Sequence, residues 1–96
     1  MSGTLFIWDA DKNKTNIRKH GVSFNEASTV FSDENAILVS DEEHSDSEER
    51  FIMIGLSANL RLLVVCHCYR ESDTVIRIIS ARKAINKEDE LYGGGQ

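Results

Sequence analysis

Four cations lie on or directly beside the most apolar stretches of this acidic chain. They are Arg50, Arg77, Arg82 and Lys83. Guanidinium and ammonium groups held on a rigid sheet bind a phosphate and stabilise the extra negative charge of a phosphorane. Together with a histidine such as His67 for proton transfer, these side chains suit metal-independent RNA cleavage. Phosphate binding without cleavage needs the same cations, so the set alone does not separate an enzyme from a binding protein.

Two of these cations, Arg82 and Lys83, lie where a C-terminal helix is expected to begin. Ser80 is a suitable cap for that helix and places both cations in its first turn. The helix macrodipole disfavours cations there, which indicates an anion, such as a phosphate, bound at exposed backbone N–H groups. The alternative is a structural ion pair from Arg82 or Arg77 to a glutamate such as Glu49. We favour the phosphate site, because local rules are most often broken at functional sites.

The role of His67 depends on the register of a hairpin that the sequence leaves open. A three-residue turn places His67 opposite Arg77 on one face of the sheet. A turn of two or four residues places Arg77 with Cys66 and Cys68 instead. A core histidine with satisfied hydrogen bonds is the alternative interpretation of His67.

The remaining candidates also have structural explanations. Lys19 and His20 end the first expected helix, where cations suit the dipole, so a structural role explains them as well as catalysis does. Arg50 follows an acidic run and opens a strand, so it is either a phosphate clamp or a neighbour of Glu49.

The cysteines argue against a metal site, and the sequence contains no P-loop, GxGxxG, GxSxG, HExxH or CxxC motif that would indicate another chemistry. Cys66 and Cys68 point to one face of a strand and His67 to the other, so the three do not converge on a metal ion. We therefore expect no metal and no cofactor. Reduced thiols, with neither a signal peptide nor a membrane-spanning run, predict a cytoplasmic protein that does not contact a membrane.

Charge is unevenly distributed in this chain of 96 residues and net charge −5. Residues 1–20 hold four cations and two acids, residues 21–60 hold one cation and nine acids, and residues 61–96 hold six cations and five acids. The acidic block peaks in "DEEHSDSEE" (41–49), a solvated loop or a contact for a basic partner, and its His44 has no second metal ligand at a suitable spacing. Cations at both ends of the chain are compatible with a nucleic-acid partner.

The pattern of apolar residues predicts one α+β domain over residues 1–92, followed by a flexible Gly-rich tail at 93–96. Expected strands cover residues 5–9, 36–40, 50–56, 61–69 and 74–80, and expected helices cover 9–21, 22–35 and 80–92. Short connections make the last three strands an antiparallel meander with 61–69 in its centre. Ser23 and Glu26 have the spacing of a capping box.

The first helix is expected to be mostly polar. Asp9 or Asp11 caps its start and Gly21 ends it. Only Ala10 and Ile17 look core-facing, so we expect packing of these two residues to hold it on the sheet.

Three segments of the chain resemble one known family. They are "FIWDADKNKTNIRKHGVSFNEASTVF" (6–31), "EERFIMIG" (48–55) and "IRIISARKA" (76–84). Over residues 6–92 the chain resembles the BrnT family of type II toxin–antitoxin toxins. The resemblance implies a RelE-like fold, in which N-terminal helices pack on a mainly antiparallel sheet with a C-terminal helix. It also implies a ribonuclease that inhibits translation and is neutralised by a BrnA antitoxin, whose ribbon-helix-helix domain binds operator DNA.

The resemblance further implies which positions form the site. The matching positions are Lys19, His20, Glu49, Arg50, Arg77, Ser80 and Arg82. Arg77 and Arg82 are the first candidates for phosphate binding and transition-state stabilisation, and Arg50 is the third. Lys83 is a further phosphate contact. His67 competes with Lys19 and His20 for proton transfer.

Two functions remain to be separated. In the first, the protein is a metal-independent endoribonuclease whose partners are RNA and a BrnA-like antitoxin, with operator DNA reached only through the antitoxin. In the second, it is a non-catalytic toxin homologue that binds the antitoxin as a transcriptional corepressor. Loss of RNA cleavage on changing Arg77 and Arg82, with folding intact, would favour the first.

Overall fold

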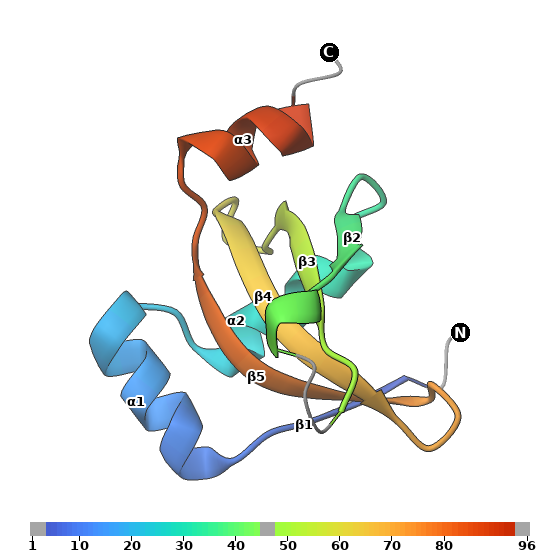
Figure 1. The fold of residues 1–96 in the computed structure, drawn as a ribbon. Helices are drawn as coiled ribbons and strands as arrows, with labels where there is room; N and C mark the ends of the chain where they lie inside the picture. Colours follow the sequence, from blue (N-terminus) through green and yellow to red (C-terminus); the bar gives the residue numbers. More distant parts are fainter. Residues whose placement is uncertain (1–3, 45–47, 94–96) are drawn as a thin grey trace.

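A five-stranded sheet in the order β1-β5-β4-β3-β2 organises the fold (Figure 1). The computed structural model describes residues 4–44 and 48–93. Its elements are β1 (Leu5–Ile7), α1 (Ala10–His20), α2 (Phe24–Thr29), the 3-10 helix η1 (Val30–Ser32), β2 (Ile37–Ser40), the 3-10 helix η2 (Glu42–His44), β3 (Phe51–Leu56), β4 (Leu62–Arg70), β5 (Val75–Lys83) and α3 (Asn86–Gly93). The α+β class is confirmed.

The meander formed by β3, β4 and β5 is antiparallel, as expected, and β4 lies in the centre of the sheet. At one edge β1 pairs with β5 in parallel, and at the other β2 pairs with β3 antiparallel. In Figure 1, α2 lies behind the sheet and the green η2 lies in front of it. The sheet therefore has one face covered by α2 and an opposite face, here called the open face.

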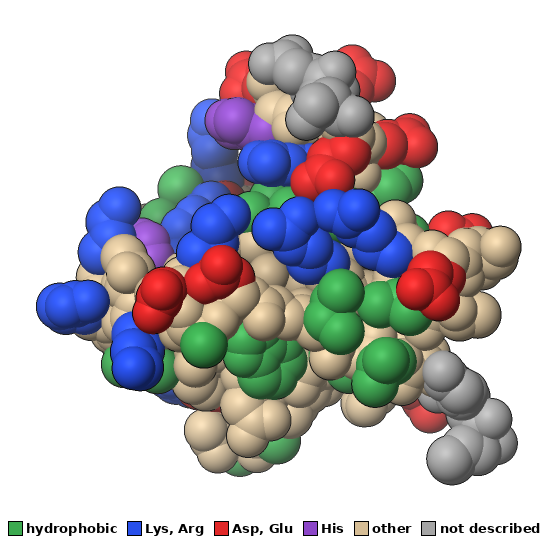
Figure 2. Space-filling view, turned by 90° about the horizontal axis from the view of Figure 1, so that it is seen from below, with side chains coloured by type: hydrophobic (Ala, Val, Ile, Leu, Met, Phe, Trp, Pro, Cys, Tyr) green, Lys and Arg blue, Asp and Glu red, His purple; other side chains and the backbone are tan. Residues whose placement is uncertain are grey.

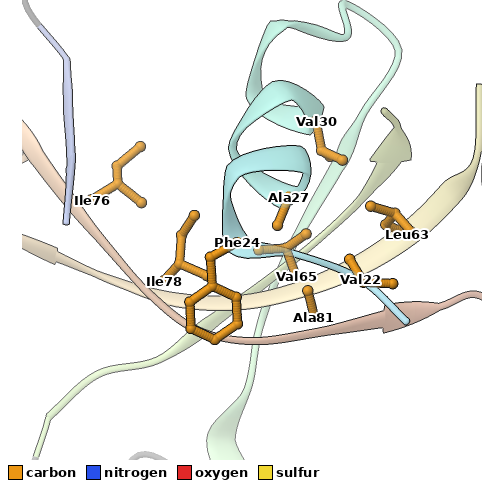
Figure 3. Close-up of a cluster of buried hydrophobic side chains, with 9 residues drawn as sticks. All are labelled: Val22, Phe24, Ala27, Val30, Leu63, Val65, Ile76, Ile78 and Ala81. Carbon is orange, nitrogen blue, oxygen red and sulfur yellow. The ribbon is translucent and has the colours of Figure 1, made fainter. Parts of the chain in front are cut away.

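The core fills the space between α2 and the sheet. Figure 3 shows its nine buried side chains: Val22, Phe24, Ala27, Val30, Leu63, Val65, Ile76, Ile78 and Ala81. The expected cap of α2 is confirmed, because the backbone N–H of Glu26 donates to Ser23 Oγ at 3.0 Å. α2 is shorter than expected, since the helical hydrogen bonds tighten into η1 after Thr29.

Both ends of α1 lie where the sequence predicts them. Asp9 Oδ1 accepts from the backbone N–H of Asp11 at 2.8 Å and of Lys12 at 3.1 Å, so Asp9 is the cap. Gly21 ends the helix at φ 70°, and its N–H donates to the Ile17 carbonyl at 2.8 Å. A left-handed conformation at this position is nearly free of strain only for glycine.

The side chain of Asn16 joins α1 to β5. Asn16 Nδ2 donates to the carbonyls of Val22 and Ala81, each at 2.8 Å, and Asn16 Oδ1 accepts from the Ala81 N–H at 3.1 Å. β1 pairs with β5 only as far as Arg77, so the amide completes the edge of β5 beyond that point. The expected packing of Ala10 and Ile17 is wrong, because both are exposed.

The expected C-terminal helix starting at Ser80 is wrong in its first turn. β5 continues to Lys83, with Arg82 paired to Val64 and Lys83 to Leu63, and α3 begins only at Asn86. Pairing with the central strand overrides the helix propensity of this segment. Arg82 and Lys83 therefore point to opposite faces of the sheet and not to a helix N-terminus.

The hairpin register is also resolved. Arg70 pairs with Val75 across a four-residue turn, and Arg77 pairs with Cys68. Of the two registers left open by the sequence, this is the one that places Arg77 with the cysteines. Gly93 is the last residue of α3 and not part of a tail. Residues 94–96, like residues 45–47 of the acidic segment, lie outside the described residues.

A carboxylate network joins α2 to the β3–β4 turn. Arg61 Nε donates to Glu26 Oε2 at 2.9 Å, Arg61 Nη2 donates to Glu26 Oε1, and Ser57 Oγ donates to Oε2 at 2.7 Å. The hydrogen bonds from Arg61 hold the pKa of Glu26 at about 2, below its usual 4.5.

This lowered pKa predicts acid sensitivity. A carboxyl with a depressed folded-state pKa stabilises the fold above its unfolded pKa, and this contribution disappears as the pH falls through the folded value. Between pH 4.5 and about 2, we expect the wild type to lose on the order of 1 kcal/mol more unfolding free energy than Glu26→Gln, allowing for solvent screening. Urea unfolding of both proteins across this window measures the difference. Equal pH slopes would contradict it.

None of the helices in the described ranges is both long enough and apolar enough to cross a membrane.

Candidate active site

A hollow of about 350 Å³ opens where the end of α1, β5 and the segment before β3 meet. Its polar lining comes from three parts of the chain: His20, Asp41, His44, Arg50, Ser80 and Arg82. Ser80 and Arg82 lie on β5, and Cys66 of β4, which pairs with Ser80, also lines the hollow. The structure thus brings together four of the positions implied for the site, His20, Arg50, Ser80 and Arg82.

Arg82 is held by a glutamate of α3. Its Nη1 and Nη2 atoms donate to Glu88 Oε1 at 2.8 Å and Oε2 at 2.6 Å, and its side chain is still 40% exposed. The hydrogen bonds to Glu88 raise the pKa of Arg82, and the same bonds lower the pKa of Glu88. A structural ion pair was the alternative for this arginine, and its partner is Glu88 and not Glu49. The Arg82 side chain nevertheless keeps exposed surface and lines the hollow.

Arg50 approaches the hollow from the start of β3. Its carbonyl accepts from the Asp41 N–H at 2.9 Å, and its Nε lies 3.9 Å from Glu48 Oε1. Beside it, burial raises the pKa of the Cys66 thiol. The Asp41 carboxylate raises this pKa further, and the positive charge of Arg50 lowers it. The thiol is therefore protonated at neutral pH, and the Lys or Arg side chains that line this first hollow are Arg50 and Arg82.

A second hollow of about 290 Å³ continues from the first along α1. The two share His20, Ile79 and Ser80, and the second adds Lys12 and Lys19. We call the combined surface the groove. Figure 2 shows a row of Lys and Arg side chains that starts at α1, on the left, and runs across the middle of the view with histidine side chains beside it. The groove lining also contains Asp11 and Asp41, so the four Lys and Arg side chains outnumber the acids and a strand of nucleic acid laid there would meet mostly cations.

Three predicted catalytic or phosphate-binding residues lie outside the groove lining, as does Glu49, which lines another hollow. His67 is fully buried, its ring 4.8 Å from that of Phe31 by centroid. Its Nδ1 donates to the Val65 carbonyl at 3.1 Å, and its Nε2 lies 3.3 Å from the Tyr69 hydroxyl. Burial lowers the pKa of His67, so the ring is a neutral core histidine with both nitrogens bonded.

Lys83 and Arg77 are separated from Arg82 in different ways. Lys83 points to the face of Leu63 and lines another hollow with Arg61. Arg77 pairs with Cys68, two residues from Cys66, and so shares the open face with the groove. It is half-buried and lies farther along β5.

Asp41 and His44 also belong to the site, although the sequence suggests only an acidic loop for Asp41 and no metal ligation for His44. His44 Nδ1 lies 3.0 Å from Asp41 Oδ2, and both residues line the hollow beside Arg50. The available signal was their spacing of three residues, which a single 3-10 turn brings together. In residues 4–44 and 48–93 no three His, Cys, Asp or Glu side chains are grouped to hold a metal ion.

A comparison with protein families decides what kind of protein carries this groove. The sequence model described as "Ribonuclease toxin, BrnT, of type II toxin-antitoxin system" matches residues 8–88. The chain belongs to the BrnT family. It is thus a member of a family of ribonuclease toxins that have antitoxin partners, and the resemblance seen in the sequence is confirmed.

A solved BrnT structure agrees with this assignment. The chain is similar to the crystal structure of the Brucella abortus ribonuclease toxin BrnT, with 26% sequence identity and a TM-score of 0.66. The match covers 86% of this chain and 100% of the Brucella BrnT chain. No curated protein matches the chain. The range matched by the family model, residues 8–88, includes every residue that lines the groove.

Proposed function

We propose that this BrnT protein is a metal-independent endoribonuclease whose groove holds the scissile phosphate between Arg82, Arg50 and His20. The observation that carries the proposal is the convergence of these residues, from β5, from the position just before β3 and from the end of α1, on one hollow of about 350 Å³. Two guanidinium groups at one phosphate supply planar, permanently charged donors. They stabilise the phosphorane most when its negative charge is greatest.

The chemistry requires a proton to leave the 2′-hydroxyl and another to reach the leaving 5′-oxygen. His20 is exposed and lies on the wall shared by both hollows, so it has access to substrate and solvent. We assign it to proton transfer. Attack by the 2′-oxygen then forms a bond to phosphorus, the bond to the 5′-oxygen breaks, and a 2′,3′-cyclic phosphate remains.

The flanking cations are assigned to the RNA strand. Lys19 lines the groove on α1, and Arg77 lies on the open face on the other side of Ser80. In this proposal they bind phosphates beside the scissile one, where each supplies affinity without sequence preference. We place the reaction in the cytoplasm, where translated RNA is found. His67 and Lys83 are left out of the catalytic set.

The partner that we propose is a BrnA-like ribbon-helix-helix antitoxin, and operator DNA is bound only through it. The strongly acidic block of residues 21–60 suits contact with a basic segment of that partner. A RelE-like arrangement of helices on the sheet fits the same proposal.

The direct test is cleavage of purified RNA in EDTA. We expect the wild-type protein to cut, and mass spectrometry to find 2′,3′-cyclic phosphate and 5′-hydroxyl ends. Restored activity only with an added divalent ion would contradict metal independence. If the protein cleaves neither free RNA nor RNA on translating ribosomes, the non-catalytic corepressor is favoured.

A further inference from the structure

The groove contains a second histidine, His44, whose ring is fixed by a carboxylate. His44 Nδ1 lies 3.1 Å from Asp41 Oδ1 and 3.0 Å from Asp41 Oδ2. Asp41 is itself anchored, because its backbone N–H donates to the Arg50 carbonyl at 2.9 Å. The Asp41 side chain is 12% exposed and the His44 side chain 63% exposed. A largely buried, anchored carboxylate thus orients a ring that remains open to solvent and to the groove.

This geometry determines which nitrogen of His44 can act. A carboxylate accepts only from a protonated nitrogen, so Nδ1 carries a proton and donates to Asp41. Nε2 is then the atom that exchanges a proton with a substrate, as in other carboxylate–histidine pairs. The ion pair exists only while both nitrogens carry protons. That is the state in which a residue that protonates a leaving group must begin the reaction.

From this contact we propose that His44, oriented by Asp41, is the acid that protonates the leaving 5′-oxygen. The inference rests on the proposed ribonuclease function and completes its proton transfers. His20 takes the proton of the 2′-hydroxyl as the 2′-oxygen bonds to phosphorus. His44 Nε2 gives its proton to the 5′-oxygen as the phosphorus–oxygen bond breaks. One proton is taken up and one is released, so the protein ends the step with the same total charge.

The position of His44 suits this role better than a structural one. His44 lies at the end of η2 and lines the hollow that also contains Arg50 and Arg82. Ion pairs that involve an exposed side chain add little to stability, so the fold does not explain the contact. For the same reason a substitution at His44 is expected to leave the protein folded.

The test compares two substrates that differ only in the leaving group. One is a short RNA, and the other carries sulfur in place of the bridging 5′-oxygen at the cleavage site. A thiolate is a good leaving group that needs no acid, because a thiol is far more acidic than an alcohol. We expect His44→Gln to slow cleavage of the ordinary RNA by about 10²-fold or more and to cleave the sulfur substrate at close to the wild-type rate. Asp41→Asn should show the same pattern with a smaller loss.

Matched variants separate the inference from the proposed function. Glu43 is the residue of η2 next to His44, and it does not line the hollow. The Glu43→Gln variant should therefore cleave both substrates at the wild-type rate. Arg82→Gln should slow both substrates, because phosphorane stabilisation is needed with either leaving group. If His44→Gln slows cleavage of both substrates equally, or slows cleavage of neither, His44 is not the acid. The ribonuclease proposal would still stand in either case. If the wild-type protein cleaves neither, the proposed function fails and this inference fails with it.

Discussion

Replacing Arg82 with glutamine is expected to lower the rate of RNA cleavage by about 10²-fold or more, the usual effect of removing one transition-state donor. Arg82 projects from β5 into the hollow that contains His20 and Arg50. A neutral amide keeps most of the volume but loses the charge and the planar fork that match a phosphate. The loss should appear mainly in kcat, because the charge of the phosphorane exceeds that of the bound phosphodiester. Single-turnover cleavage of a short labelled RNA measures it.

The ion pair with Glu88 allows a sharp control for this prediction. Arg82→Gln removes both the catalytic cation and the link between β5 and α3, whereas Glu88→Gln weakens the same link and leaves the guanidinium in place. We expect Glu88→Gln to cleave RNA at least as fast as the wild type, because a neutral amide competes less with phosphate for Arg82. Equal losses in both variants would assign Arg82 to holding α3 in place, and the catalytic role would be rejected.

The opposite outcomes at Arg82 and His67 show where reasoning from sequence reached its limit. The sequence predicts a helix that begins near Arg82, where a cation is unusual, but β5 continues through this residue and no helix begins there. The helix-terminus argument for Arg82 is therefore wrong, although the residue does line the hollow. His67 was a candidate only in one hairpin register, and the four-residue turn selected the other. Both outcomes depend on strand pairing, which local propensity does not determine.

Features that depend on neighbouring residues were predicted more accurately. Asp9 and Ser23 cap the helices that they precede, and Gly21 ends α1 in the left-handed conformation. Each of these hydrogen bonds closes within a few residues, so the sequence contains all of its partners. The Asp41–His44 contact is equally local, yet it was missed because the acidic segment was read as a loop. Contacts between distant segments, such as Asn16 with Ala81, have no such signature.

Asn16 carries the largest stability effect that we expect from a single substitution. Replacing it with leucine leaves three backbone groups in the protein interior without their partners: the carbonyls of Val22 and Ala81 and the N–H of Ala81. The Asn16 side chain is only 6% exposed, so water has little access to replace the amide. An unsatisfied buried polar group costs about 1–3 kcal/mol. We expect Asn16→Leu to lower the free energy of unfolding by about 3–5 kcal/mol and Tm by about 15 °C or more.

Urea and thermal unfolding measure this loss, with Asn25→Ala as the control. Asn25 is an exposed asparagine of the neighbouring helix α2, and its replacement should change stability by no more than about 0.5 kcal/mol. A loss below about 1 kcal/mol for Asn16→Leu would mean that water satisfies the edge of β5 once the amide is gone.

The substitution should also affect the site, because Asn16 fixes α1, which carries His20, against the part of β5 that carries Arg82. At temperatures where Asn16→Leu is still folded, we therefore expect its RNA cleavage to be slower than that of the wild type, since the proton-transfer group and the cation are no longer held at one spacing.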